Sequence, residues 1–77
     1  MSRIKQRREL RRRFALAMEE LEALNESLRD AYRCFNEGTD PEILEACFLE
    51  ISALHSRRSA ALRNIKSMDG DTIKWQL

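Results

Sequence analysis

The side chains with the greatest chemical reactivity are those of Cys34, Cys47 and the single histidine, His55. Thiolates and imidazoles bind zinc, but a structural zinc site needs several ligands at defined spacings, such as Cys-x-x-Cys pairs. The two cysteines lack that spacing, and no carboxylate or cysteine lies three or four residues from His55. The sequence therefore predicts no metal site and no cofactor, and we interpret His55 as a contact residue on the side of a helix.

A disulfide between Cys34 and Cys47 is the other chemistry that this pair suggests. The two residues fall in different amphipathic segments, close to the turn between them. Packed helix axes stand about 8–10 Å apart, whereas a disulfide requires Cα atoms roughly 4.4–6.8 Å apart. Because Cys34 projects beside the apolar stripe of its segment, we expect no disulfide. Cys47 is predicted to be a small core residue, and a structural or intermolecular role stays open for Cys34.

Glutamates concentrate between residues 19 and 26, where neighbouring carboxylates can bind iron or act as acid and base. Di-iron bundles combine such glutamates with a Glu-x-x-His motif, which the sequence lacks. No nucleophile, base and oxyanion donors converge on one segment either. We therefore expect a solvated acidic face, no catalytic residues, and a protein that is not an enzyme.

Charge is segregated along the chain, although the formal net charge is only +1. Residues 1–13 carry seven basic side chains and one acid, residues 14–50 carry ten acids and two arginines, and residues 51–77 carry five basic side chains and two acids. If the chain folds back on itself, the two basic ends meet and can attract nucleic acid or anionic lipid. The alternatives are plain solvation, or pairing with the acidic turn of a second copy. The candidate nucleic-acid or anion patch comprises Arg3, Lys5, Arg7, Arg8, Arg11, Arg12, Arg13, Arg57, Arg58, Arg63 and Lys66.

The chain is short, with 77 residues, of which 35% are charged and 43% hydrophobic. A single core in a domain of this size supplies only about 3–5 kcal/mol, so partner chains are expected. The longest apolar run, residues 14–18, has five residues, against the roughly 20 that span a membrane. With two cysteines and no segment typical of secretion, the sequence predicts a cytoplasmic protein without a transmembrane segment.

Apolar side chains in the first half of the chain repeat at alternating steps of four and three residues. This spacing keeps one face of a helix against a partner helix, as in coiled coils. The pattern predicts a long helix over about residues 3–36, followed by a turn over 37–40 in which Gly38 takes the left-handed conformation. The stripe comprises Leu10, Phe14, Ala17, Leu21, Leu24, Leu28, Ala31 and Phe35.

A second helix is predicted over about residues 41–68. Asp40 can cap it with Pro41 at the first helical position, or Thr39 and Glu42 can form a capping box, and both alternatives stay open. The apolar stripe again steps by three and four residues. It comprises Leu44, Cys47, Ile51, Leu54, Arg58, Ala61, Ile65 and Met68.

The short turn makes the two helices neighbours, so the predicted fold class is all-α, an antiparallel two-helix hairpin. In register, the stripes place apolar side chains opposite each other in seven of eight layers, from Phe35 with Leu44 to Leu10 with Met68. Apolar residues also lie outside the stripes, so we expect two hairpins to form a homodimeric four-helix bundle. The candidate self-association surface comprises Leu16, Ile43, Phe48, Leu49, His55 and Leu62.

Arg58 is the one charged residue in either stripe, in the layer of Leu21. A buried guanidinium needs a carboxylate partner, which Glu20, Glu22 or an acid of a second copy can supply. Alternatively, the long side chain extends to the rim of the seam and stays in water.

The predicted helical domain comprises residues 1–68, and Gly70 is expected to end the second helix. Within the predicted tail, residues 69–77, apolar and polar residues alternate from Asp71 to Leu77, which is typical of an extended segment. We expect a flexible C-terminal tail, or one that docks on the hairpin or on the sheet edge of a partner. The candidate docking residues are Ile73, Trp75 and Leu77.

The stretch from Ala31 to Leu62 resembles the YaaL-like family of short proteins from Gram-positive bacteria. The chain departs from the family pattern at His55 and Ser59, where aromatic side chains are usual. The resemblance covers about half of the chain, and it implies a cytoplasmic helical hairpin of unknown biochemical role. The matching residues are Phe35, Asn36, Thr39, Asp40, Pro41, Ile43, Ala46, Glu50 and Ala53.

Two functions agree with these patterns. The first is a self-associating adaptor or regulator that binds a protein partner through apolar surface left over by the hairpin. The second is a nucleic-acid-binding protein that uses the basic open end without reading sequence, since no helix-turn-helix, zinc finger or aromatic platform accompanies the arginines. Binding to an anionic membrane surface is a third hypothesis.

Overall fold

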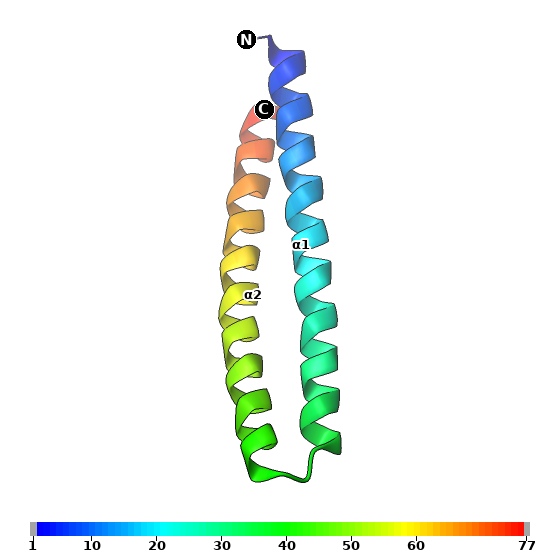
Figure 1. Cartoon of the computed structure of the whole chain (residues 1–77). Helices are drawn as coiled ribbons and strands as arrows, with labels where there is room; N and C mark the ends of the chain where they lie inside the picture. Colours follow the sequence, from blue (N-terminus) through cyan, green and yellow to red (C-terminus); the bar gives the residue numbers. More distant parts are fainter. Residues whose placement is uncertain (1, 77) are drawn as a thin grey trace.

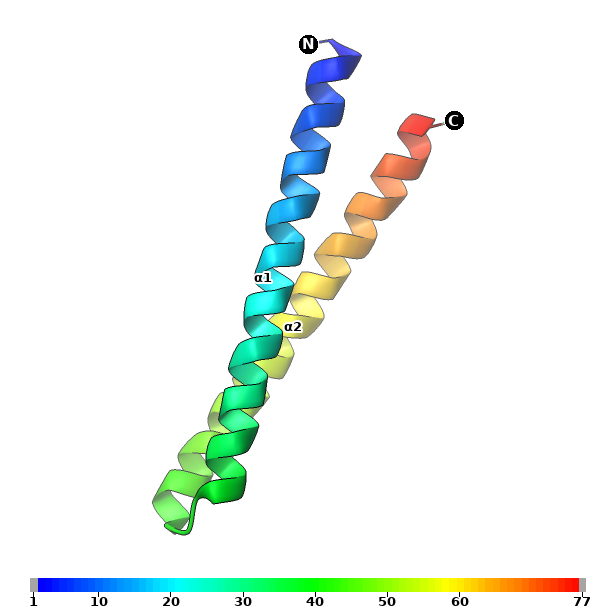
Figure 2. The same cartoon turned by 90° about the vertical axis from the view of Figure 1, so that its right-hand side faces the viewer.

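The chain folds into two long helices joined by a short turn (Figure 1). The structure is a computed structural model that describes the backbone of residues 2–76 and the side chains of residues 2–68. Helix α1 spans Arg3–Glu37 and helix α2 spans Pro41–Gln76, and the two run antiparallel along each other (Figure 2). The predicted all-α hairpin is therefore confirmed, and no strand occurs among the described residues.

The core is a single seam between α1 and α2, built from the two stripes that the sequence predicts. Nine stripe residues are buried. The other stripe residues are half-buried, apart from Phe35, which is 38% exposed. Leu54, near the middle of α2, is the most buried, at 4%. All nine buried side chains among residues 2–68 belong to the stripes, namely Ala17, Leu24, Leu28, Ala31, Cys47, Ile51, Leu54, Ala61 and Ile65.

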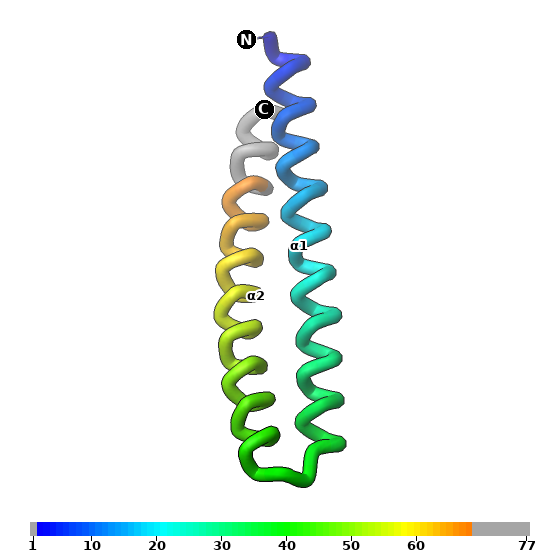
Figure 3. Tube along the Cα trace, in the orientation of Figure 1, coloured from blue at the N-terminus to red at the C-terminus, as the bar shows by residue number. Residues whose placement is uncertain are grey.

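The hairpin is a slender rod with extents of 57 × 16 × 15 Å (Figure 3). Two helices without a further layer leave both flanks of the seam next to solvent, and no described side chain is completely shielded from it. Among the described residues, neither helix contains a stretch apolar enough to cross a membrane. Among residues 2–68, burial is therefore confined to the seam.

The turn corrects one prediction, because Gly38 is not left-handed. Its φ of −72° and ψ of 140° are those of an extended residue. The Gly38 N–H donates a 2.9 Å hydrogen bond to the Cys34 carbonyl, which completes the last turn of α1 without a left-handed residue. A Cβ atom at position 38 would lie 3.0 Å from Leu44 Cδ2 and 3.1 Å from the Cys34 oxygen. Glycine suits this position because the chain is crowded there.

Both helices begin with a side-chain cap. At the start of α1 the Lys5 N–H donates to Ser2 Oγ at 3.3 Å. At the start of α2 the Glu42 N–H donates to Asp40 Oδ1 at 2.9 Å, with Pro41 at the first helical position. Of the two capping alternatives, the structure therefore shows the Asp40 cap.

The predicted C-terminal tail falls outside the residues whose side chains are described. Helix α2 has the bounds Pro41–Gln76, whereas the sequence predicts a helix end near residue 68 and a tail over 69–77. Ile73, Trp75 and Leu77 lie in that part of the chain, so their docking stays a prediction.

Replacing Asp40 with alanine should lower the free energy of unfolding by about 1 kcal/mol, because the first free N–H groups of α2 lose their acceptor. Thr39→Ala is the matched control, and it should change stability by less than about 0.5 kcal/mol, since Thr39 is exposed and does not provide the cap. Urea denaturation followed by circular dichroism measures both. A larger loss at Thr39 than at Asp40 would show that the capping box starts α2.

Candidate functional site

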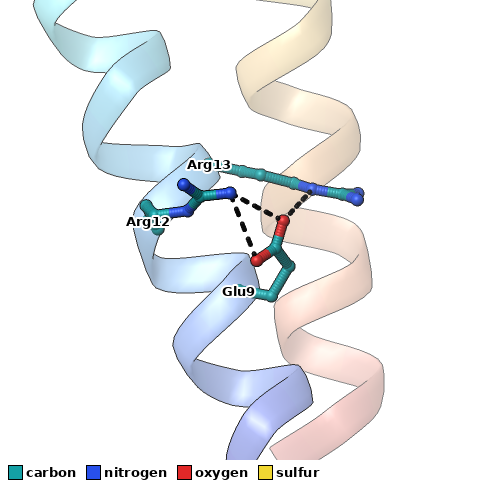
Figure 4. A network of polar contacts seen from close by, with 3 residues as sticks. All are labelled: Glu9, Arg12 and Arg13. Atoms are coloured by element: carbon teal, nitrogen blue, oxygen red, sulfur yellow. Dashed lines mark hydrogen bonds and ion pairs between the residues drawn. The ribbon is translucent and has the colours of Figure 1, made fainter. Parts of the chain in front are cut away.

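The first three turns of α1 form a basic surface at the open end of the hairpin, the end opposite the turn (Figure 1). Arg12 Nη2 lies 3.2 Å from Glu9 Oε1, and Arg13 Nε lies 3.3 Å from the same oxygen. Figure 4 shows both guanidinium groups converging on this one carboxylate. The hydrogen bond from Arg12, its positive charge and the neighbouring Arg13 lower the pKa of Glu9. Glu9 therefore neutralises part of the basic surface.

Most of the predicted anion patch remains exposed. Within residues 2–68, Arg7, Arg8 and Arg11 form no ion pair with any acid. Ala61 and Ile65 of α2 pack in the same seam as Ala17 of α1, so Arg63 and Lys66 lie nearest to the basic segment of α1, whereas Arg57 lies closer to the turn. The exposed members of the predicted patch are Arg3, Lys5, Arg7, Arg8, Arg11, Arg12, Arg13, Arg57, Arg63 and Lys66.

Arg58 does not belong with this exposed group. It is half-buried in the seam, and its Nε donates a 2.8 Å hydrogen bond to Asn25 Oδ1 on α1. The sequence predicts a carboxylate partner or an extension into water, and neither is what the structure shows. An amide oxygen one turn from Leu21 is sufficient for the guanidinium, because the side chain is only partly removed from solvent.

A second polar contact crosses between the helices on the same flank. The Tyr32 hydroxyl lies 2.9 Å from His55 Nε2, and the two rings meet edge to face with centroids 6.0 Å apart. Tyr32 follows Asn25 by seven residues, so helical periodicity puts both on one side of α1. Sequence reasoning missed Tyr32, although the seven-residue spacing was a usable signal.

This Tyr32 flank, defined by Asn25, Tyr32, Phe48, His55 and Leu62, contains three members of the predicted self-association surface. Phe48, His55 and Leu62 are spaced by seven residues along α2, and Phe48 is 59% exposed. Other predicted members point elsewhere: Leu16 and Leu49 are exposed away from this flank. The structure therefore divides the predicted surface over more than one face.

The opposite side, the Cys34 flank, contains an open groove of about 520 Å³ beside the turn. Carboxylates from both helices line it, Asp30 from α1 and Glu50 from α2, and Arg33 Nη1 lies 3.9 Å from Asp30 Oδ1. Ile43, another predicted self-association residue, lies here and not on the Tyr32 flank. The remaining lining residues are Ser27, Ala31, Cys34, Ala46 and Cys47.

The two cysteines meet in this groove, which corrects the sequence prediction that they are too far apart. Both are free thiols, and Cys47 Sγ lies 2.9 Å from Cys34 Sγ. The spacing of helix axes is a poor guide here, because each Cα lies about 2.3 Å from its axis. Residues that lean toward each other are therefore much closer than the axes, and the small Ala31 and Ala46 leave room for both sulfurs.

The environment of Cys47 favours its protonated form. The pKa of the Cys47 thiol is raised by the hydrogen bond it shares with Cys34, by burial, and by the negative charge of Glu50. Cys34, in contrast, is exposed to water. Within the described residues no three potential metal-ligating side chains lie together.

Comparison with protein-family models, with curated proteins and with solved structures finds no match. The resemblance of residues 31–62 to the YaaL-like family therefore stays a prediction from the sequence. The features of the molecule that bear on function are the basic surface, the Tyr32 and Cys34 flanks, and the contact between the Cys34 and Cys47 thiols.

Asn25→Ala and Arg58→Met should each lower the free energy of unfolding by about 1 kcal/mol, because each removes one partner of the cross-helix hydrogen bond. A double-mutant cycle measured by urea denaturation should give a coupling energy of about 1 kcal/mol between the two sites. Glu26→Ala, at an exposed position beside Asn25, is the control and should cost less than about 0.5 kcal/mol. Additive losses at Asn25 and Arg58 would contradict the bond.

Proposed function

We propose that the protein is a non-enzymatic helical hairpin that self-associates and acts as a small adaptor or regulator for a protein partner. The observation that carries this proposal is the amount of apolar surface left uncovered by the seam. Seven large hydrophobic side chains are exposed in the described part of a 77-residue chain. Phe48 and Leu49 are the extreme cases among those on α2, at 59% and 61% exposed. Exposed apolar surface such as that of Tyr32 and Phe48 on the Tyr32 flank is typical of protein interfaces.

A homodimeric four-helix bundle is the arrangement that best covers the Tyr32 flank. A second hairpin laid against this flank would remove Phe48 and Leu62 from water and enclose the Tyr32–His55 hydrogen bond. The seam would then be covered on one side, as in bundles whose helices pack through successive apolar positions. The Cys34 flank is a poorer dimer surface, because Asp30 and Glu50 bring negative charge to its groove.

A partner protein would then use the apolar side chains that the dimer leaves exposed. Leu49 lies on the outer face of α2, and Leu16 lies on α1 away from the Tyr32 flank. These residues are separated from the Tyr32 flank by the helical periodicity, so one copy can contact a second copy and a different protein at once. This separation is what distinguishes an adaptor from a simple dimer.

Sedimentation velocity at micromolar concentrations should show a dimer of about 18 kDa, twice the 9.1 kDa of one chain. Phe48→Glu should weaken dimerisation by at least about tenfold, because it places a charge in the contact. Ala53→Glu is the matched control: it adds the same charge at an exposed position of α2 that helical periodicity places away from the Tyr32 flank, and it should leave the dimer intact. A wild-type monomer throughout this range, or equal effects of both variants, would exclude this dimer.

Nucleic-acid binding by the open end is a second candidate, favoured by the exposed and unpaired Arg7, Arg8 and Arg11 within the described residues. Phosphate contacts would replace condensed counterions, so binding would be strong at low salt and insensitive to sequence. Proteins that recognise a DNA sequence insert a helix or a strand into a groove and contact the base edges there. The arginines at the open end are not part of such a motif, so binding without sequence preference is expected.

In a fluorescence anisotropy titration at about 50 mM salt, random duplex DNA should bind with a dissociation constant well below about 1 mM. The affinity should fall steeply as the salt concentration rises. The double variant Arg8→Gln with Arg11→Gln should reduce the slope of log K against log salt by about two. Arg29→Gln with Arg33→Gln removes the same charge from residues nearer the turn and should change the slope little. Two results would exclude this candidate: an equal reduction of the slope in both double variants, or a dissociation constant of the wild type above about 1 mM at low salt.

A further inference from the structure

The Cys34 and Cys47 thiols form the one contact between two oxidisable side chains in the described part of the chain. The two sulfurs are 2.9 Å apart, and a disulfide bond is about 2.05 Å long, so bond formation requires an approach of roughly 0.9 Å. The thiols come from different helices and meet on the side of the turn. A bond between them would therefore join α1 to α2 next to the existing linker.

We propose that Cys34 and Cys47 are a redox modification site, at which a hydroperoxide converts the two thiols into a disulfide that joins the helices. This inference is independent of the proposed self-association, because the Cys34 flank lies opposite the Tyr32 flank.

The reaction balances in two steps. In the first, Cys34 sulfur attacks the outer oxygen of the hydroperoxide, the O–O bond breaks, and Cys34 becomes a sulfenic acid while the leaving oxygen departs as water or an alcohol. In the second, Cys47 sulfur attacks Cys34 sulfur, the S–O bond breaks, the S–S bond forms, and the sulfenic oxygen leaves as water with the Cys47 proton. Two thiols lose two electrons, and one hydroperoxide gains them.

The different surroundings of the two sulfurs assign these roles. Cys34 is exposed and borders the open groove, so a small peroxide reaches it from solvent. Cys47 is only 8% exposed, and it donates its S–H toward Cys34 Sγ. The raised pKa of Cys47 keeps that proton in place before oxidation, so Cys47 is the resolving thiol. Contact between the two residues makes the second step intramolecular, and it therefore precedes capture of the sulfenic acid by another molecule.

The new bond would change the behaviour of the turn end. In the reduced protein the helices are held there by Ala31, Cys47 and the half-buried Leu44. A disulfide between residues 34 and 47 closes a short loop in the unfolded chain and reduces its freedom. The oxidised hairpin should therefore melt at a temperature higher by roughly 10–20 °C.

The test treats the reduced full-length protein with hydrogen peroxide and digests it after glutamate under non-reducing conditions. Glu37, Glu42 and Glu45 lie between the two cysteines, so digestion separates the peptides that carry Cys34 and Cys47 unless a disulfide links them. We expect a linked pair that is lighter than its two free peptides by two hydrogen atoms, that comes from one chain on a non-reducing gel, and that separates on addition of dithiothreitol.

Two serine variants test the roles of the two cysteines separately, so the proposal can be contradicted even if one variant folds poorly. Cys47→Ser should accumulate a Cys34 sulfenic acid that dimedone traps, and exposed Cys34→Ser should react with peroxide at least about tenfold more slowly than the wild type. Circular dichroism checks that each variant remains helical. The proposal is overturned if the folded wild type forms only links between chains, if Cys34 proceeds to sulfinic acid without a linked peptide, or if both thiols stay free.

Discussion

The packing of small and branched apolar side chains along one seam is the interaction on which the rest of this protein depends. Every buried side chain among residues 2–68 belongs to that seam. Within the described part of the chain there is no strand and no further layer to support the two helices. Because the apolar residues are spaced alternately by three and four positions, the same face of each helix stays toward the other over many turns. The half-buried Phe14 and Met68 near the open end therefore also contribute to the seam.

The seam also determines what each flank can do. Asn25 and Tyr32, each one position after a seam residue on α1, form cross-helix hydrogen bonds with Arg58 and His55 of α2. On the other flank Cys34 meets Cys47 in the groove. One flank is thus aromatic and apolar between its hydrogen bonds, whereas the other is acidic and contains thiols. The two proposals made for this protein use different flanks because the seam keeps those surfaces apart.

Much of the fold is predictable from the sequence, because the spacing of apolar residues specifies two helices and the face that each buries, and the short turn makes the helices antiparallel neighbours. The buried residues Leu24, Leu28, Ile51 and Leu54 are all members of the predicted stripes. Details that depend on atomic positions are not predictable in this way. The sequence predicts a left-handed Gly38, but the structure has an extended one. Its N–H completes the last helical hydrogen bond without a left-handed residue, and Leu44 lies close to it.

The candidate site was less predictable than the fold for a similar physical reason. Clustering of basic residues at the open end follows directly from the chain order and the hairpin. The Cys34–Cys47 contact does not, since it depends on how far each side chain leans from its own axis. The same holds for Tyr32 and His55, whose bond runs diagonally across the flank. Periodicity assigns residues to a face, whereas contact between particular atoms also requires rotamers and local helix separation.

The stability of Leu54→Ala tests most directly the claim that one seam holds the fold. Urea denaturation of this variant, followed by circular dichroism at several protein concentrations, should show a loss of about 3 kcal/mol, because the most buried side chain of the seam leaves a cavity. Ser52→Ala, two positions away and exposed, should change stability by less than about 0.5 kcal/mol. Equal and small changes in both variants would contradict the claim and show that the hairpin is held together by something other than its seam.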